Sequence, residues 1–155
     1  MESTDEEVLD VLRQAKLLAQ RYRALTGNPL GITGEVAEYE AAHILGVHLT
    51  PARHAGYDAI ETVDGVERWL QIKGRCFPAD SSAGQRLGSI DITKEWNAVL
   101  LVLVDENFDA YEIHEAERDA VVAALIAPGS IARNVRGALA VNQFTKIGRR
   151  RWQAD

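Results

Sequence analysis

Asp58, Gln71 and Lys73 bring a carboxylate, an amide and an amine to the middle of this chain. Gln71 and Lys73 flank an apolar residue in a run typical of a β-strand. Successive side chains of a strand point to opposite faces, so these two share one face while Leu70 and Ile72 take the other. Asp58 lies near the start of a preceding run that also resembles a strand. The pattern predicts two strands whose polar residues can meet.

A tight turn between the two runs would bring these residues together. The stretch Val63 to Gly65 contains an Asp-Gly pair, which favours a two-residue hairpin turn because both residues tolerate positive φ angles. A hairpin closed here places Asp58 at a strand position next to Gln71 and Lys73. We therefore expect an acid, an amide oxygen and an ammonium group at one end of a small sheet.

These groups suit a hard divalent cation that acts on a phosphate. Mg²⁺ takes oxygen ligands, including one or two carboxylates, and keeps several waters for a phosphate-bearing substrate. Asp58, the Gln71 side-chain oxygen and the Ile72 carbonyl could supply the protein ligands. Lys73 would stabilise charge that builds on the phosphate. The alternative is an acid at a strand start and a lysine on a solvated strand face, and these residues alone leave both interpretations open.

A helix predicted from Thr33 to Leu45 adds a further acid. Thr33 is a suitable N-cap, Gly46 follows the helix, and Glu35 lies in its first turn. A helix dipole favours an acid at that position, so a purely structural role for Glu35 is also open. Glu38 lies one turn further along the same face and is the second choice for a functional acid.

Three segments, taken in order, resemble the PD-(D/E)xK phosphodiesterases, also called restriction-endonuclease-like nucleases. They are Gly31-x-x-Gly34-Glu35, Gly56-Tyr57-Asp58 and Gln71-Ile72-Lys73. The glutamine in place of an acid looks most like the Mrr-type branch, which restricts methylated DNA. The helix opening is similar to that of archaeal Holliday-junction resolvases, and the segment SIARNVRGALAV is similar to an uncharacterised bacterial domain family placed near these nucleases. The resemblance covers residues 31–114 at motif level.

The resemblance implies an α/β fold in which helices flank a restriction-endonuclease-like mixed β-sheet. It also implies a Mg²⁺-dependent endonuclease that hydrolyses DNA phosphodiester bonds, in restriction, defence or repair. Asp58, Gln71 and the Ile72 carbonyl would hold the metal. Lys73 would position or deprotonate the attacking water, and Glu35 would bind a second metal or orient the first ligands through water. In-line attack would leave a 5′-phosphate.

Gln71 is the one departure from the family pattern. A neutral oxygen binds Mg²⁺ more weakly than a carboxylate, so Mn²⁺ is expected to serve as well or better. The same departure supports an alternative, a catalytically inactive relative that binds nucleic acid or a protein partner. A third interpretation is an unrelated dimeric scaffold in which these polar residues are incidental.

Length and charge indicate one domain with an uneven charge distribution. The 155 residues divide into an N-terminal helix at 1–28, a catalytic core at 31–114, and a C-terminal helix with a basic extension at 115–155. Residues 118–155 hold seven Lys/Arg and two Asp/Glu, although the whole chain has a net charge of −6. Such a basic end could bind nucleic acid, DNA first with RNA left open, or it could be only a solvated tail.

The residues expected to contact nucleic acid are basic side chains beyond the proposed site and in the C-terminal extension. They are Arg75, Arg86, Lys94, Arg133, Arg136, Lys146, Arg149 and Arg150. Arginine suits this role because its planar fork matches phosphate oxygens.

The rest of the chain predicts further elements around the hairpin. Expected strands lie at 48–53, 98–104, 108–114 and 138–141, and expected helices at 5–25, 115–127 and from 142 onward. The strand at 48–53 contains a proline and suits a sheet edge. The loop at 76–95 either contacts substrate or is a surface excursion.

The first of these helices carries one apolar stripe. Ser3 and Thr4 are suitable N-caps for it. The stripe comprises Val8, Leu12, Ala15, Leu18/Ala19, Tyr22 and Leu25. We expect it to pack on the domain core, with pairing in a homodimer as the alternative.

Targeting features are not evident in the sequence. The longest apolar run, Ala98 to Val104, is far too short to span a bilayer, and the acidic N-terminus lacks the apolar stretch of a signal peptide. The single cysteine, Cys76, fits a reducing compartment. These features predict a cytoplasmic protein without a membrane partner.

Overall fold

The computed structural model describes residues 3–28, 30–51, 56–78, 85–128 and 138–155. It is an α/β structure in which helices flank a six-stranded mixed sheet. The strands follow one another in the order β1 (His48–Leu49), β2 (Ala59–Val63), β3 (Val66–Cys76), β4 (Ala98–Val104), β5 (Ala110–Glu117) and β6 (Arg149–Gln153). Neighbouring strands are antiparallel except β3 and β4, which are parallel.

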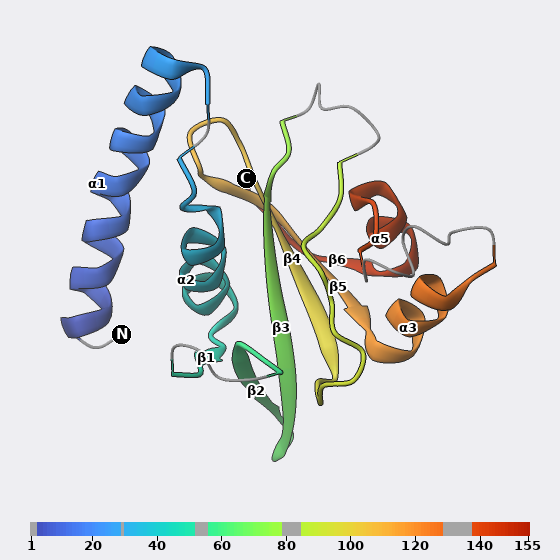
Figure 1. Ribbon diagram of the computed structural model, residues 1–155. Helices are drawn as coiled ribbons and strands as arrows, with labels where there is room; N and C mark the ends of the chain where they lie inside the picture. The colour runs from blue at the N-terminus through green and yellow to red at the C-terminus, as the bar shows by residue number, and fades with distance from the viewer. Residues whose placement is uncertain (1–2, 29, 52–55, 79–84, 129–137) are drawn as a thin grey trace.

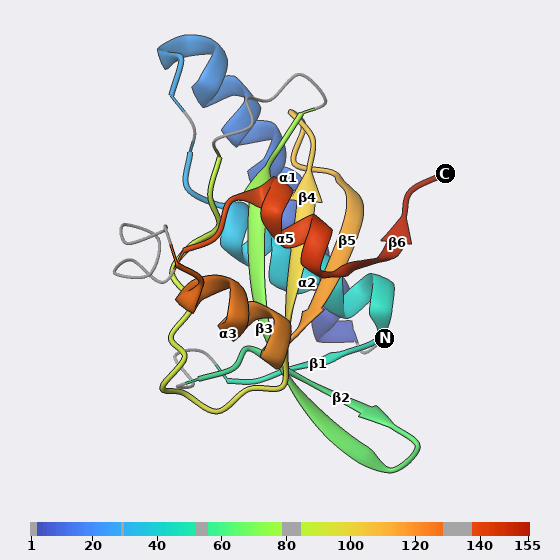
Figure 2. The same cartoon turned by 90° about the vertical axis from the view of Figure 1, so that its right-hand side faces the viewer.

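The helices form layers on the two faces of this sheet. α2 (Thr33–Leu45) lies against one face, and α1 (Ser3–Thr26) lies outside α2 (Figure 1). α3 (Arg118–Ile126) and α5 (Val141–Ile147) cover the other face (Figure 2). No helix in these described ranges is both long and apolar enough to cross a lipid bilayer.

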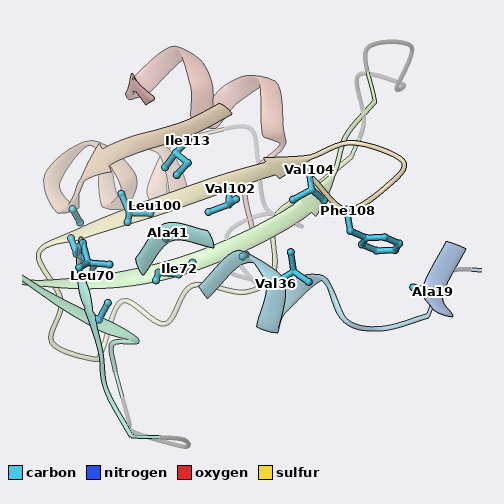
Figure 3. Packing of buried hydrophobic residues seen from close by; sticks show 14 residues of the cluster. Ala19, Val36, Ala41, Leu70, Ile72, Leu100, Val102, Val104, Phe108 and Ile113 are labelled. Atoms are coloured by element: carbon cyan, nitrogen blue, oxygen red, sulfur yellow. The ribbon is translucent and has the colours of Figure 1, made fainter. Parts of the chain in front are cut away.

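Two apolar clusters hold the layers together through β4, whose seven residues are all buried. On the α2 face, Val36 and Ala41 pack with Leu70, Ile72 and the neighbouring strand residues (Figure 3). On the other face, Val99, Leu101 and Leu103 pack with α3, α5 and part of the connection between β3 and β4. Strand alternation sends Leu70 and Ile72 to the first cluster, so Gln71 and Lys73 face the side of α3 and α5.

The predicted hairpin is confirmed. β2 and β3 pair antiparallel from Ala59↔Leu70 to Val63↔Val66, which leaves a two-residue turn. Asp64 and Gly65 in this turn have φ angles of 51° and 78°. These values are those of the hairpin turn that an Asp-Gly pair favours.

Several element boundaries differ from the prediction. The helices expected at 5–25 and 33–45 are present, but Ile32 rather than Thr33 is the N-cap residue of α2. α1 begins at Ser3, so Ser3 and Thr4 lie within it rather than before it. α3 begins at Arg118 and not at residue 115, because residues 115–117 continue β5 in register with β4.

The C-terminal part differs most. The strand expected at 138–141 is only an isolated bridge between Ala140 and Arg86, and α5 already begins at Val141. β6 was not predicted and forms the last strand of the sheet. β1 is shorter than the predicted 48–53, and residues 52–55 lie outside the described part. It is an edge strand, as predicted.

Part of the connection from β3 to β4 packs into the protein core. Residues 79–84 lie outside the described ranges, but Leu87, Ile90 and Trp96 are buried in the cluster shared with α3 and α5. Parallel strands need a crossover of this kind, and here its described part contains no helix. The described part is therefore not a loose surface excursion.

The expectation that the α1 stripe packs on the core is wrong for three of its seven residues. Leu12 and Ala19 pack against the α2-side cluster. Leu18, Tyr22 and Leu25 are 61%, 41% and 77% exposed. These three residues lie on a side of α1 that does not face the core.

A buried ion-pair cluster joins the hairpin to the far strands. Glu61 on β2 and Glu115 on β5 are only 8% and 2% exposed. Arg68 Nη1 lies 3.0 Å from a Glu61 oxygen and 3.2 Å from a Glu115 oxygen. Arg151 on β6 also pairs with both acids. We call these four residues the ionic cluster; they lie beyond α2 on its side of the sheet.

Candidate functional site

Asp58 lies immediately before β2, opposite Gln71 in the extended register of the hairpin. Its backbone N–H donates to the Leu70 carbonyl at 2.8 Å. Its side-chain Oδ2 accepts a hydrogen bond from the Ile72 backbone N–H, also at 2.8 Å. The carboxylate is thus fixed against β3 by a main-chain donor, with Oδ1 not used in this bond.

Gln71 is almost fully buried, at 8% exposed. Its Nε2 donates to the Gly56 carbonyl at 2.9 Å, which orients the amide. Its Oε1 is buried and has no hydrogen-bond partner among the described residues. A buried acceptor left unpaired costs about 1–3 kcal/mol, so such atoms often mark the place of a water or an ion.

Lys73 lies two positions further along the same strand face. Lys73 is half-buried, and the burial of its amine lowers its pKa below the usual lysine value. The negative charge of Asp58 opposes this shift, and the positive charge of Arg75 adds to it. A Cβ atom on Gly88 would lie 4.0 Å from Lys73 Nζ, so the glycine leaves space beside the amine.

The α2 acids approach this site unequally. Glu35 is exposed, whereas Glu38 is half-buried. Burial raises the pKa of Glu38, and the negative charges of Asp58 and Glu35 raise it further. Glu38 therefore shares an electrostatic environment with Asp58, and it is the better-placed of the two acids expected from the sequence.

The helix carrying these acids is held close to β3 by Gly74. A Cβ atom on Gly74 would lie 2.5 Å from the Ala37 Cβ and 2.8 Å from the Thr33 carbonyl oxygen. Real Cβ atoms do not approach other atoms so closely. The glycine next to Lys73 therefore allows the first turns of α2 to lie directly on the strand.

Glu38→Gln is expected to raise the melting temperature at neutral pH without added metal. The raised pKa of Glu38 means that the folded state binds this proton more tightly than the unfolded state. That contribution favours folding below the unfolded pKa and is lost as the pH rises through the folded pKa. At neutral pH the ionised side chain therefore destabilises the fold, and the neutral amide removes the effect.

Differential scanning calorimetry at two pH values checks this prediction. Well below the pKa of a free glutamate, both proteins hold a neutral group and should melt at similar temperatures. A variant that melts at a lower temperature than the wild type at neutral pH would contradict the assignment.

The basic residues next to the site differ in their hydrogen bonds and in their exposure to solvent. Arg75 Nε donates to the Arg86 carbonyl at 2.6 Å, and Nη1 donates to the Gly74 carbonyl at 2.7 Å. Arg86 and Lys94 are exposed. A Cβ atom on Gly56 would lie 3.4 Å from the Lys94 Cβ, which shows that Lys94 lies beside the segment leading to Asp58.

Arg149 and Arg150 are not brought to this site. Arg149 lies 3.0 Å from Glu115, and Arg150 lies 3.6 Å from Glu112, so acids of β5 compensate both charges. β6, which carries the two arginines, is at the opposite edge of the sheet from β1. Lys146 is exposed on α5. The candidate contacts Arg133 and Arg136 lie outside the described residues.

Sequence reasoning missed an aromatic pair beside the site. Tyr57 stacks on Trp69 with ring centroids 4.9 Å apart and planes 14° apart. Trp69 lies on the same face of β3 as Gln71 and Lys73. This alternation along the strand could have predicted from the sequence that Trp69 lies near the site. Trp69 also lines a cavity of about 340 Å³ together with Lys94, Asn97 and Arg118.

The donor set for a metal is limited. Within the described ranges, no group of three or more His, Cys, Asp or Glu side chains lies close enough to hold an ion. A cation here would depend on Asp58, the unpaired Gln71 oxygen, a main-chain carbonyl such as that of Ile72, and water. Hard cations such as Mg²⁺ accept this kind of oxygen set, so the donors fit the ion in type.

Neither a scan against protein-family models nor a search of curated proteins finds a match to this chain.

Proposed function

We propose that this protein is a metal-dependent nuclease that hydrolyses DNA phosphodiester bonds. The observation that carries the proposal is the meeting of Asp58, Gln71 and Lys73 at the start of the β2–β3 hairpin, with the buried Gln71 Oε1 left without a partner among the described residues. A carboxylate, an amide oxygen and a half-buried amine at one point suit phosphodiester hydrolysis.

The proposal includes a restriction-endonuclease-like fold. A mixed sheet between helices, with the acid and the Gln-x-Lys triplet on adjacent antiparallel strands, supports it. The motif resemblance described above points the same way.

Each residue has a role that its environment favours. Asp58 would hold Mg²⁺ or Mn²⁺ together with Gln71 and the Ile72 carbonyl, and the hydrogen bond from Ile72 N–H fixes its carboxylate for this purpose. When bound, the cation supplies charge stabilisation for the phosphate and a more acidic water. We propose that Glu38 takes the role first given to Glu35, because Glu38 is the half-buried acid of α2 whose charge interacts with that of Asp58.

Lys73 would handle the proton of the attacking water. A half-buried amine with a lowered pKa gives up its own proton more readily than a free lysine, which suits a general base. In its charged form the same amine stabilises negative charge on the phosphate oxygens. Lys94 and Arg86, exposed near the site, are suited to contact the phosphate backbone.

Calorimetric titration with Mn²⁺ tests the proposal directly. We expect the wild type to bind the ion and Asp58→Asn to lose most of the affinity. Asparagine keeps an oxygen that can accept the bond from Ile72 N–H, so the variant should stay folded while the charge is removed. Asp64→Asn makes the same chemical change in the turn of the same hairpin and should bind like the wild type.

A second candidate function is a non-catalytic module that binds nucleic acid or a protein. The limited donor set favours it, because the described residues provide no cluster of three acidic, histidine or cysteine ligands. This module needs no cation. A wild-type titration without heat of binding, combined with retained DNA binding, would therefore favour the module over the nuclease.

A further inference from the structure

α1 carries an apolar stripe with the spacing of a coiled coil, and four of its six residues are exposed. Its residues alternate in steps of three and four: Val8, Val11, Ala15, Leu18, Tyr22 and Leu25. This is the a/d pattern by which two helices pack knobs into holes. Val11 is 62% exposed and Leu25 is 77% exposed. We call this stripe the seam.

The seam is separate from the side of α1 that contacts the body. Leu12 and Ala19 pack on the core, and Lys16 Nζ lies 2.9 Å from Glu40 and 3.2 Å from Asp109. These attachments fix how the helix is rotated. α1 lies outside α2, at the margin of the molecule, where a second helix can approach (Figure 1).

The charges of α1 are divided between its two ends. Its acidic residues all lie in the first half, at Asp5, Glu6, Glu7 and Asp10. Its basic residues all follow, at Arg13, Lys16, Arg21 and Arg23. Two copies of this helix side by side in the same direction would place like charges together. The antiparallel direction places the acidic half of each copy against the basic half of the other.

The seam also matches itself when one copy is reversed. Val8 then lies level with Leu25 of the partner subunit, and Val11 with Tyr22 of the partner subunit. Ala15 lies level with Leu18 of the partner subunit. Every seam residue finds an apolar partner because the step pattern is the same from either end, and an a position meets a d position in each layer.

We propose that a second copy of this chain covers the seam, in an antiparallel α1–α1 pair with two-fold symmetry. Such an interface is self-complementary, as a closed homodimer requires. It uses none of the residues assigned to the hairpin site. The dimer can therefore be tested independently of the proposed nuclease activity.

Light scattering coupled to size-exclusion chromatography tests the pair with the full chain. We expect a dimeric mass for the wild type and a monomeric mass for Leu18→Asp, with dimerisation weakened about a hundredfold or more by an unpaired charge in the seam. Leu17→Asp is the matched control, because Leu17 is equally exposed, at 65%, but lies outside the seam. It should remain dimeric.

Far-UV circular dichroism verifies that both variants are folded, as expected for substitutions of exposed residues. A wild-type chain that is monomeric at every concentration overturns the proposal. Equal effects of the two aspartates also overturn it, because the seam would then have no special role.

Disulfide cross-linking tests the direction of the helices. In a Cys76→Ser background, the double variant Val8→Cys/Leu25→Cys should form covalent dimers under mild oxidation, and each single variant should not. The antiparallel pair brings position 8 next to position 25 but separates each position from its own copy. Cross-linking by the single variants would indicate parallel helices and overturn the proposed arrangement.

Discussion

Alanine at position 73 should abolish metal-dependent DNA cleavage without loss of stability. The half-buried amine of Lys73 interacts with the charge of Asp58 and is the group that would move the proton of the attacking water. Loss of a general base lowers the rate by about 10²- to 10⁴-fold. The measurement is the rate of nicking of a supercoiled plasmid in saturating Mn²⁺, with branched DNA as a second substrate.

Stability and metal binding distinguish this effect from unfolding. The lowered pKa of Lys73 means that folding disfavours its charged form, so removing the charge should leave the melting temperature unchanged or higher at neutral pH. Lys73 is not among the proposed ligands, so Lys73→Ala should bind Mn²⁺ like the wild type, in contrast to Asp58→Asn. Cleavage at the wild-type rate by Lys73→Ala would show that the role is wrongly assigned.

Gly74→Ala should destabilise the protein more than other glycine substitutions in the described ranges around α2. The new methyl group would meet the Ala37 Cβ at 2.5 Å and the Thr33 carbonyl at 2.8 Å, both on a helix that is packed against the sheet. Overpacking of this kind costs about 1–3 kcal/mol. Urea denaturation measures the free energy of unfolding for the variant and the wild type.

Gly34→Ala is the matched control for this substitution. Gly34 lies in the first turn of α2, and a Cβ atom there meets nothing within 4 Å. Alanine is favoured over glycine within helices by about 0.5–1 kcal/mol, so this variant should be slightly more stable. If Gly74→Ala unfolds at the same urea concentration as the wild type, the close packing of α2 on β3 is not needed for the fold.

Local signals explain the parts of the site that the sequence could predict. The Asp-Gly turn and the polar–apolar alternation around Ile72 were enough to predict the hairpin and the shared face of Gln71 and Lys73. Both signals depend only on backbone preferences within a few residues. The seven-residue apolar run of β4 was equally local, and the strand was predicted with its observed bounds.

The choice between the two α2 acids could not be made this way. Glu35 and Glu38 lie one turn apart, and the sequence gives no reason to prefer the second. Their burial depends on how α2 crosses β3, which the close approach at Gly74 decides. A contact between residues so far apart in the chain is visible only in three dimensions.

The basic C-terminal residues show the same limit. From the sequence, the basic run at 149–151 was expected to contact nucleic acid through Arg149 and Arg150. In the structure it forms β6, and Glu112, Glu115 and Glu61 pair with its arginines. The acids come from distant strands, so the compensation of charge could not be inferred from the composition of residues 118–155.

The ionic cluster has a consequence for the hairpin that carries Asp58 and Lys73. Burial alone would raise the pKa of Glu115, but three surrounding arginines outweigh it and hold that pKa below its usual value. The stability that this provides is present above the unfolded pKa and is lost as the pH falls through the folded pKa. Asp58 and Lys73 lie at one end of the hairpin. Nearer the turn, Glu61 and Arg68 connect the hairpin to β5 and β6 by ion pairs. At low pH, protonation of Glu115 would weaken these ion pairs. The hairpin would then be held less firmly, and the position of Asp58 at its other end would become less fixed.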